Sequence, residues 1–399
     1  MCRPRPRETT MACPGSDPSN IYRAEDIQVL SGLEPIRRRP AMYIGSTDAR
    51  GLSHLLFELV TNSLAEAVAG HGRSVRVTLR ADGSAEVADD GRILPSSDSV
   101  EDVFTSYGTG YRGYCPYPGG REYAGYLFAN ALSERLRVVV RSDSSRYQHI
   151  FQRAVTHAVL QSGGPPDDRG LTIAFRPDPE IFGGVQFDRD AIRNRLQQLA
   201  FLHSRVRITF SDETTGTHEE FEYADGIAAY VRWLNTERKP LHEDVLLIHG
   251  EEQGVRYEIG LQWCEGDEEM RTSFANHYRT QNGGTHDNGV RLGVAAALRD
   301  FIREHTPQTI EFQAEDLRSG LTAVVSVWLV EPRFESATRS RLGNSEVESI
   351  VRAAVRRGVR EYLEANRDAA NGIVNEVVLA QKLRVAAADA RRQLRRKDE

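Results

Sequence analysis

The first strong pattern along the chain is a helix followed by a hairpin. Within residues 51–70 (GLSHLLFELVTNSLAEAVAG) the apolar residues recur at the spacing of an amphipathic helix, and Gly70 ends the pattern. These apolar positions are Leu55, Leu56, Leu59, Val60, Leu64, Ala67 and Val68. Over residues 75–87 apolar and polar residues alternate on both sides of Asp82-Gly83, which predicts two antiparallel strands joined by a tight turn.

The rest of the chain alternates between strand and helix patterns. Residues 91–120 are rich in Gly, Ser, Pro and Tyr, so we expect a long loop, which inside a compact domain is usually functional. Further strands are expected at 137–142, 171–175, 206–210, 257–263 and 321–330. Further helices are expected near 125–133, 188–202, 226–235, 289–304 and from Ser345, with a basic helical end over 381–399. The expected fold class is α+β in both halves.

The length of the chain predicts more than one domain. At 399 residues it is too long for one ordinary hydrophobic core. A polar break at TERKPLHED (236–244) is the candidate boundary, so we expect a first domain over 21–235 and a second over 236–399. Residues 1–20 are expected to form a flexible tail; they contain arginines but no apolar core of a secretory signal.

Composition and charge exclude several classes of protein. Hydrophobic residues make up 40% and charged residues 27%, which is typical of a globular chain. The net charge of −6 argues against a general nucleic-acid coat protein, so any DNA contact must be local. Four scattered cysteines fit a reducing cytoplasm, and no apolar run is long enough to span a membrane.

A polar face on the first helix is a candidate for chemistry. Glu58, Asn62 and Glu66 are spaced by four residues, which stacks them on one face, opposite the leucines. A carboxylate and a carboxamide placed in this way can hold a water molecule and Mg²⁺, a cation that takes few protein ligands and completes its shell with phosphate and water. The alternative is an ordinary solvated helix face.

The strand that follows ends in a second candidate. Alternation places Asp89 on the same face as the apolar Val87, so a carboxylate points where apolar side chains go and needs a hydrogen-bond donor. The amino group of a purine would serve. Asp89 opens the glycine-rich loop, whose backbone N–H groups can surround phosphates before the helix expected at 125–133. The alternative is that these glycines only make turns.

The order of these motifs resembles the GHKL superfamily of ATPases, and within it the family of the DNA gyrase B-subunit and its topoisomerase IV counterpart. The resemblance runs from about Ile21 to the C-terminus and includes SGLEPIRRRPAMYIGS, FELVTNSLAEAVAG, NALS, QLAFLHSRV, GGTH, EDLRSGLTAVVSV and EPRFESATRSRLGNSEV. It implies a GHKL (Bergerat) ATPase sandwich followed by a transducer domain like ribosomal protein S5. It also implies that the chain ends before the metal-binding (TOPRIM) cleavage domain, so that alone it cannot cut and reseal DNA.

The resemblance assigns roles residue by residue. It implies that Glu58 is the general base, Asn62 the ligand of Mg²⁺ and Asp89 the acceptor of the adenine amine. Arg339, on the loop over 336–340, would reach the γ-phosphate from the second domain. Further nucleotide-site positions would be Gly91, Arg92 (braced by Glu66), Pro95, Gly119, Gly120 and Gly125, and a dimerisation arm would include Tyr22 and Ile27.

This sequence departs from the family pattern around the phosphates. Tyr123 and Ile93 replace glycines, Leu171 replaces a threonine, and the second-domain loop has Arg339 where the family has lysine. Arginine keeps the charge but changes the reach and geometry. Two interpretations stay open: a slow ATPase that retains base, metal ligand and adenine carboxylate, or a paralogue that does not hydrolyse ATP and acts as a scaffold or regulator.

The expected ligands and partners follow from the resemblance. They are ATP with Mg²⁺, a second copy in a homodimer, double-stranded DNA in the dimer cavity and a full gyrase subunit paired through the shared arm, with no membrane. Arginines that recur on one helix are candidates for the DNA contact: Arg352, Arg356, Arg357 and Arg360. The alternative for them is a solvated charged face. A histidine kinase or chaperone of the superfamily is disfavoured, because such proteins do not resemble the second half.

Overall fold

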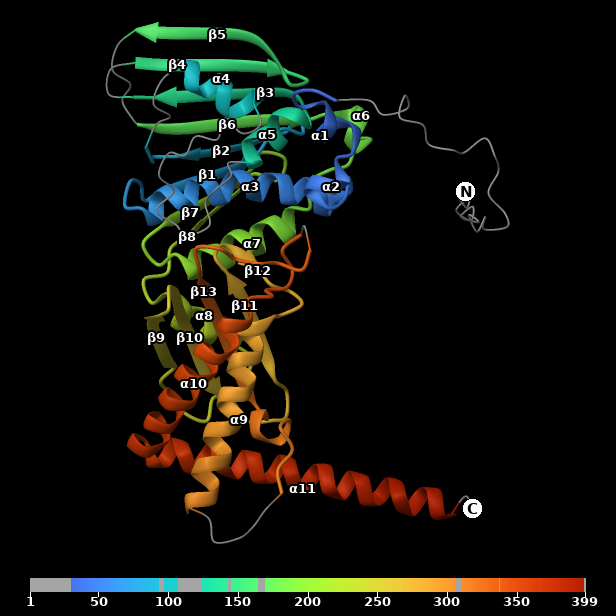
Figure 1. Cartoon of the computed structure of the whole chain (residues 1–399), viewed down its shortest axis with the longest axis vertical. Helices are drawn as coiled ribbons and strands as arrows, with labels where there is room; N and C mark the ends of the chain where they lie inside the picture. The colour runs from blue at the N-terminus through green and yellow to red at the C-terminus, as the bar shows by residue number, and fades with distance from the viewer. Residues whose placement is uncertain are drawn as a thin grey trace, which may run out of the picture.

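Two β-sheets follow one another along the long axis of the molecule (Figure 1). The computed structural model describes residues 30–92, 97–106, 124–142, 145–163, 169–305, 311–336 and 338–397. Within these residues no helix has both the length and the apolar character needed to cross a membrane. The two sheets and their covering helices confirm the α+β prediction.

The first sheet has eight strands in the order β5-β4-β3-β6-β2-β1-β7-β8. Their bounds are β1 Ser74–Leu79, β2 Ala85–Asp89, β3 Ser133–Arg141, β4 Ser145–Gln152, β5 Val155–Gly163, β6 Gly170–Pro177, β7 Arg207–Asp212 and β8 Thr217–Phe221. The predicted hairpin is confirmed: β1 pairs with β2 in antiparallel register, with Val77 opposite Val87. A parallel pairing between β1 and β7 places the strand after α7 beside the first strand of the sheet.

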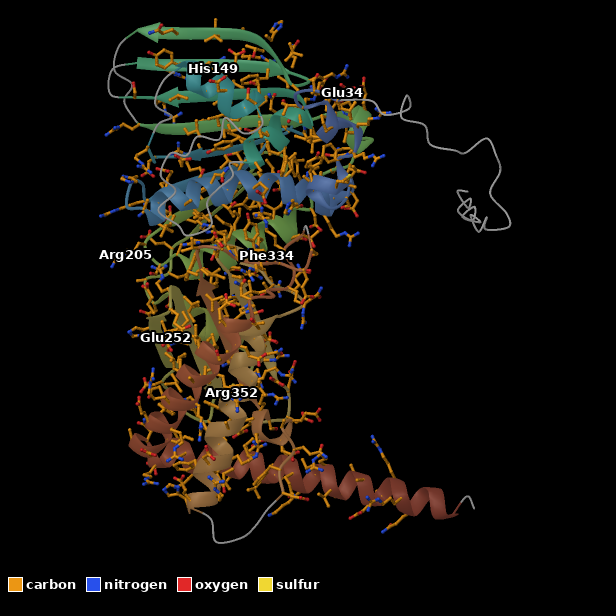
Figure 2. The ribbon with its side chains drawn as sticks, viewed as in Figure 1. Glu34, His149, Arg205, Glu252, Phe334 and Arg352 are labelled. Atoms are coloured by element: carbon orange, nitrogen blue, oxygen red, sulfur yellow. The ribbon has the colours of Figure 1, made fainter. Side chains whose placement is uncertain are left out.

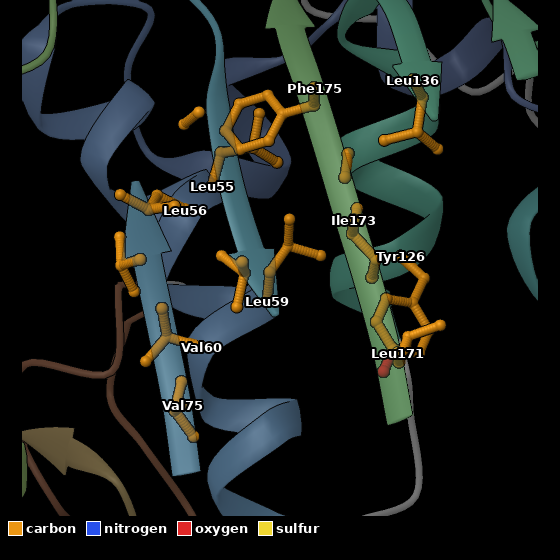
Figure 3. Close-up of a cluster of buried hydrophobic side chains, with 14 of the residues drawn as sticks. Leu55, Leu56, Leu59, Val60, Val75, Tyr126, Leu136, Leu171, Ile173 and Phe175 are labelled. Atoms are coloured by element: carbon orange, nitrogen blue, oxygen red, sulfur yellow. The ribbon is translucent and has the colours of Figure 1, made fainter. Parts of the chain in front are cut away.

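Helices cover this sheet, and α3 forms the centre of its core. The helices are α1 Glu34–Arg38, α2 Ala41–Ile44, α3 Ala49–Val68, α4 Ser97–Thr105, α5 Ala124–Ala131, α6 Pro179–Phe182 and α7 Arg189–Leu202. Asp48 caps α3 by accepting hydrogen bonds from the backbone N–H groups of its first turn. Figure 3 shows Leu55, Leu59 and Val60 of α3 directed at strand residues such as Ile173. Each such buried side chain stabilises the fold by about 1.5–3 kcal/mol.

The expected long loop over 91–120 was wrong in part, because α4 lies inside it. The physical reason is a short apolar stripe, Val100, Val103 and Phe104, that is buried beneath the sheet. The Phe104 ring stacks on Tyr126 at 4.9 Å, and Asn130 donates a hydrogen bond to the Phe104 carbonyl. This stripe is only one helical turn long, so the surrounding Ser and Gly residues concealed it.

The second sheet has five strands in the order β12-β11-β13-β10-β9. Their bounds are β9 Leu246–Glu252, β10 Val255–Trp263, β11 Met270–Ala275, β12 Tyr278–Arg279 and β13 Leu321–Trp328. The helices of this part are α8 Gly226–Leu234, α9 Thr285–His305, the 3-10 helix η3 Asp316–Arg318, α10 Ser345–Ala365 and α11 Arg367–Lys397. Every residue of β13 is buried, because α8 packs on one face of the sheet and α9 and α10 pack on the other.

Close helix packing and a projecting C-terminal helix complete the second part. A Cβ added at Gly289 or Gly293 would lie within 3 Å of valines on α10, so glycine allows α9 and α10 to approach closely. The helix α11 crosses the base of the molecule and projects away from it (Figure 1). A division between the two parts after residue 235 stays a proposal, since α8 follows the first sheet directly yet packs against the second.

Candidate active site

The polar face of α3 is built around a buried carboxylate. Glu58 is only 5% exposed, whereas Asn62 and Glu66 are half-buried. The alternative of a solvated helix face is therefore wrong at Glu58. A buried carboxylate needs compensating donors or charges, so its neighbours decide what it can do.

Three side chains converge on one oxygen of Glu58. The Nε2 atom of His54, one helical turn earlier, lies 3.5 Å from Oε1. Tyr278 of β12 donates a hydrogen bond to the same oxygen at 3.4 Å, and Nη1 of Arg339 lies 3.4 Å away. The structure thus brings the predicted pair Glu58 and Arg339 together, from two different parts of the chain. All three contacts are at the long end of hydrogen-bond distances.

Arg339 is held in this position by its backbone and by a ring. Its φ of +55° is in the left-handed region, which is unusual for a residue with a side chain, and its N–H donates to the Ser336 carbonyl at 3.0 Å. The guanidinium carbon lies 4.1 Å from the centroid of the Tyr278 ring, a cation–π contact. The Arg339 side chain remains 31% exposed, so it is within reach of a ligand in solution.

His54 is a neutral neighbour of this carboxylate. Burial lowers the pKa of His54 below 6.5, the nearby Glu58 carboxylate opposes the shift, and the Arg339 charge adds to it. At neutral pH the imidazole therefore carries no charge, and the cation that faces Glu58 is Arg339.

Asp89 ends β2 as a buried acceptor, as predicted. It is 7% exposed and accepts hydrogen bonds from the Ser63 hydroxyl at 2.6 Å and from the Gly91 backbone N–H at 3.0 Å. Burial raises the pKa of Asp89 to about 6, although these bonds and a backbone bond from Leu171 act to lower it. A further donor, such as an amino group of a base, would favour the ionised form of this carboxylate.

Close backbone approach explains three glycines around these carboxylates. A Cβ at Gly91 would lie 2.9 Å from the Glu66 Cβ, and one at Gly125 would lie 2.7 Å from the Glu58 Cβ. Gly125 thus lets α5 begin directly against α3, a packing role that the sequence analysis did not predict. A Cβ at Gly170 would lie 1.9 Å from the Asp89 backbone oxygen, so Gly170 fixes the strand next to the acceptor.

A bidentate ion pair braces the edge of the site. Arg92 donates to the two carboxylate oxygens of Glu66 at 2.8 and 3.1 Å, which is the pairing that the family resemblance implied. Leu171, in the position of the expected threonine, is buried and offers only its backbone to Asp89.

Asn62 has the properties expected of a residue that contacts a ligand. Its Nδ2 atom is buried and has no hydrogen-bond partner among the described residues. An unsatisfied buried amide costs about 1–3 kcal/mol, so the site fits a bound group that completes it. Across the described ranges no cluster of three His, Cys, Asp or Glu side chains could hold a metal ion. The orphaned Nδ2 is a donor, so the bound group that satisfies it is an acceptor such as a phosphate oxygen, whereas a Mg²⁺ would be held by the Asn62 Oδ1 and by phosphate oxygens.

Several predicted positions lie outside the described residues. These are Tyr22, Ile27, Ile93, Pro95, Gly119, Gly120 and Tyr123. Conversely, sequence reasoning did not single out His54, Ser63, Gly170 or Tyr278. The spacing of His54, four residues before Glu58 on the same helix face, was a usable signal.

The arginine-rich face of α10 is partly committed to ion pairs. Arg356 contacts Asp300 at 2.6 Å, and Arg360 contacts Glu304 at 2.8 Å, both across to α9. Arg352, labelled in Figure 2, and Arg357 are exposed. For Arg356 and Arg360 the structure therefore agrees with the alternative of a solvated charged face, on which both side chains form surface ion pairs.

Comparisons with known proteins find relatives of this chain both by sequence and by fold. A family model described as DNA gyrase B matches residues 226–393. The DNA gyrase B-subunit of Thermotoga maritima is 38% identical over 397 residues, covering 94% of this chain and 62% of that protein. The chain thus spans less than two thirds of the length of that relative.

Solved structures extend the likeness to the whole fold. The 43K ATPase domain of Thermus thermophilus gyrase B, solved in complex with an aminocoumarin, is 32% identical with a TM-score of 0.77, covering 90% of this chain and 98% of that one. The B-subunit of the DNA gyrase from Myxococcus xanthus is 26% identical with a TM-score of 0.75, covering 86% and 99%.

Proposed function

The chain belongs to the DNA gyrase B family, and we propose that it binds ATP with Mg²⁺ and hydrolyses it slowly at the site around Glu58. The observation that carries the proposal is the meeting of Glu58 on α3 with Arg339 from beyond the second sheet, at 3.4 Å. A base and a cation that come from two parts of the chain form the minimal pair for phosphoryl transfer to water, which depends on positioning and on charge stabilisation.

Each residue has a role that its surroundings support. The Glu58 carboxylate orients the attacking water and accepts its proton. Asp89, buried at the end of β2, accepts the adenine amine and fixes the base. Arg339 offsets the charge that develops on the γ-phosphate. Asn62 would hold Mg²⁺, which when bound neutralises phosphate charge.

We further propose a homodimeric clamp around double-stranded DNA as the larger role. Two observations support this role: the chain belongs to the family, and Arg352 and Arg357 on α10 are exposed. Because the chain covers 62% of the curated relative, activities of the whole relative, including pairing with other gyrase subunits, are also proposals.

A titration with a non-hydrolysable ATP analogue tests the binding half of the proposal. We expect saturable binding that tightens with Mg²⁺ and, by light scattering, a shift from monomer to dimer. Asn62→Ala should remove the Mg²⁺ dependence, whereas the exposed Asn194→Ala should not. If the chain does not bind the analogue at all, the nucleotide proposal is wrong. Binding without any hydrolysis would favour the role of a regulator or scaffold.

A further inference from the structure

A cleft of about 910 Å³ lies where the two parts of the chain meet. One wall is formed by the ends of α3 and α7 and by the residues that follow these helices. The other wall is formed by β9 and β10, with Trp328 at the end of β13. Figure 2 shows Arg205 of the first wall at the outer edge of this junction, apart from Phe334, whose ring contacts Tyr278. The cleft is therefore separate from the contact around Glu58.

Three arginines from separate segments line this cleft. Arg73 follows α3, Arg205 follows α7 and Arg256 lies on β10, and all three residues are exposed. Among the described residues, no carboxylate lies within ion-pair distance of any of these side chains. By contrast Arg207, two residues after Arg205, pairs with Glu222 at 2.9 Å. The three guanidinium groups are therefore available to an anion that comes from outside the chain.

Arg256 is positioned by an aromatic ring. It lies opposite Trp328 in the antiparallel pairing of β10 with β13, and its guanidinium carbon is 5.7 Å from the centroid of the indole ring. The indole is 6% exposed and has edge contacts with the rings of His203 and His277, at 5.8 and 4.9 Å between centroids. A guanidinium that is stacked on a fixed ring loses less conformational freedom when it binds an anion.

The two walls of the cleft differ in charge. Among the described residues that line it, the acidic ones are Glu251 of β9 and Glu258 of β10, both on the second wall. Burial raises the pKa of Glu258, although the neighbouring Arg256 opposes the shift. When protonated, this carboxyl can donate a hydrogen bond to an anion. The first wall carries Arg73 and Arg205 without an acidic side chain among its described residues, so an acid group of a ligand is favoured there.

We propose that this cleft binds a small anion with two acid groups, such as a diphosphate or a dicarboxylate. Arg73 and Arg205 hold one acid group, and Arg256 holds the other. The volume of the cleft is in the range of small-molecule sites, which often lie between domains. Because the arginines belong to different parts of the chain, the bound anion connects the two parts. This site is distinct from the proposed nucleotide site and does not depend on ATP hydrolysis.

Calorimetric titration of the whole chain in buffer without Mg²⁺ tests the site. Pyrophosphate should bind saturably and at least about tenfold more tightly than orthophosphate, because the second acid group adds a guanidinium contact. Arg205→Gln and Arg256→Gln should each weaken the binding of pyrophosphate by about tenfold. Arg352→Gln is the matched control, because it removes an exposed arginine of α10 and should bind as the wild type. Pyrophosphate affinity that is unchanged in both cleft variants, or equal to that of orthophosphate, would overturn the proposal.

Two further titrations separate this site from the nucleotide site and identify the acid group. Pyrophosphate should still bind when a non-hydrolysable ATP analogue is present at saturation, and complete displacement by the analogue would overturn the proposal. Succinate in place of pyrophosphate tests the carboxylate class. Tighter binding of either compound identifies its acid group and supports the site, whereas failure of both to bind refutes it. If the analogue itself does not bind, the proposed nucleotide function is wrong and the cleft is judged on the arginine variants alone.

Discussion

Replacing Asp89 by Asn is expected to make the nucleotide-free chain more stable at neutral pH. Asp89 is buried at the end of β2, and burial raises its pKa from 3.8 to about 6. Above that pH the folded chain must carry a buried negative charge whose only compensation is hydrogen bonding. Asn keeps the shape of the side chain, and its amide can still accept from Gly91 and donate to the Ser63 hydroxyl.

The size and sign of the effect follow from linkage. Because the folded-state pKa is raised, the stability present below the unfolded pKa of 3.8 is lost as the pH rises through about 6. The full loss of folding stability is about 3 kcal/mol when the pKa of a carboxyl is raised from 3.8 to about 6. At about pH 4.5 only about 1 kcal/mol of it is lost, and by about pH 7.5 nearly all is lost. The advantage of Asp89→Asn should therefore grow by about 2 kcal/mol between these two pH values.

Urea unfolding at the two pH values, followed by circular dichroism, measures this difference. Asp267→Asn is the matched control, because this carboxylate is exposed on a loop of the second part and its removal reports the general effect of losing one charge. An advantage of Asp89→Asn that does not change with pH would refute the reasoning, since it would show that ionisation of Asp89 costs the fold nothing. The same variant should lose affinity for nucleotide, so stability and binding change in opposite directions.

The remaining predictions concern the same site, the sheet behind it and α10. Nucleotide affinity of the wild type, measured by fluorescence, should fall below about pH 6 by up to about tenfold per pH unit, as Asp89 takes up its proton; a flat profile would contradict the role of Asp89. Gly170→Ala would place a Cβ 1.9 Å from a backbone oxygen at a φ of +126°, so it should lower the free energy of unfolding in urea by more than about 3 kcal/mol. Gly83→Ala, whose Cβ would lie in open space, should lower it by about 1 kcal/mol. Arg357→Glu should weaken duplex DNA binding about tenfold in fluorescence anisotropy at low salt, and unchanged binding would locate DNA elsewhere.

The elements that could be predicted from the sequence are those with strong local periodicity. The helix α3 and the β1–β2 hairpin are confirmed because their core-facing residues recur at the period of their own backbone. The same periodicity predicted two features of the site. Residues four apart on a helix share a face, which stacks Glu58, Asn62 and Glu66, and alternation along a strand directs Asp89 inward. The short helix α4 was missed because one turn of apolar residues gives too little periodicity.

Contacts between distant segments could not be predicted in this way. Tyr278 lies 220 residues from Glu58 along the chain, and nothing in the local sequence of a two-residue strand indicates where its hydroxyl points. Arg339 was assigned by resemblance rather than by pattern. The packing role of Gly125 and the close approach of Gly170 to Asp89 depend on which elements lie side by side, and only the folded chain shows this.

Steady-state release of phosphate from ATP is the most direct test of the central claim that Glu58 is the base of an ATPase site. The wild type should release phosphate slowly, and Glu58→Gln should abolish release while it keeps binding of the non-hydrolysable analogue. Glu361→Gln, an exposed glutamate on α10, is the matched control and should behave as the wild type. Release by Glu58→Gln at the rate of the wild type would contradict the account, because hydrolysis would then not depend on this carboxylate.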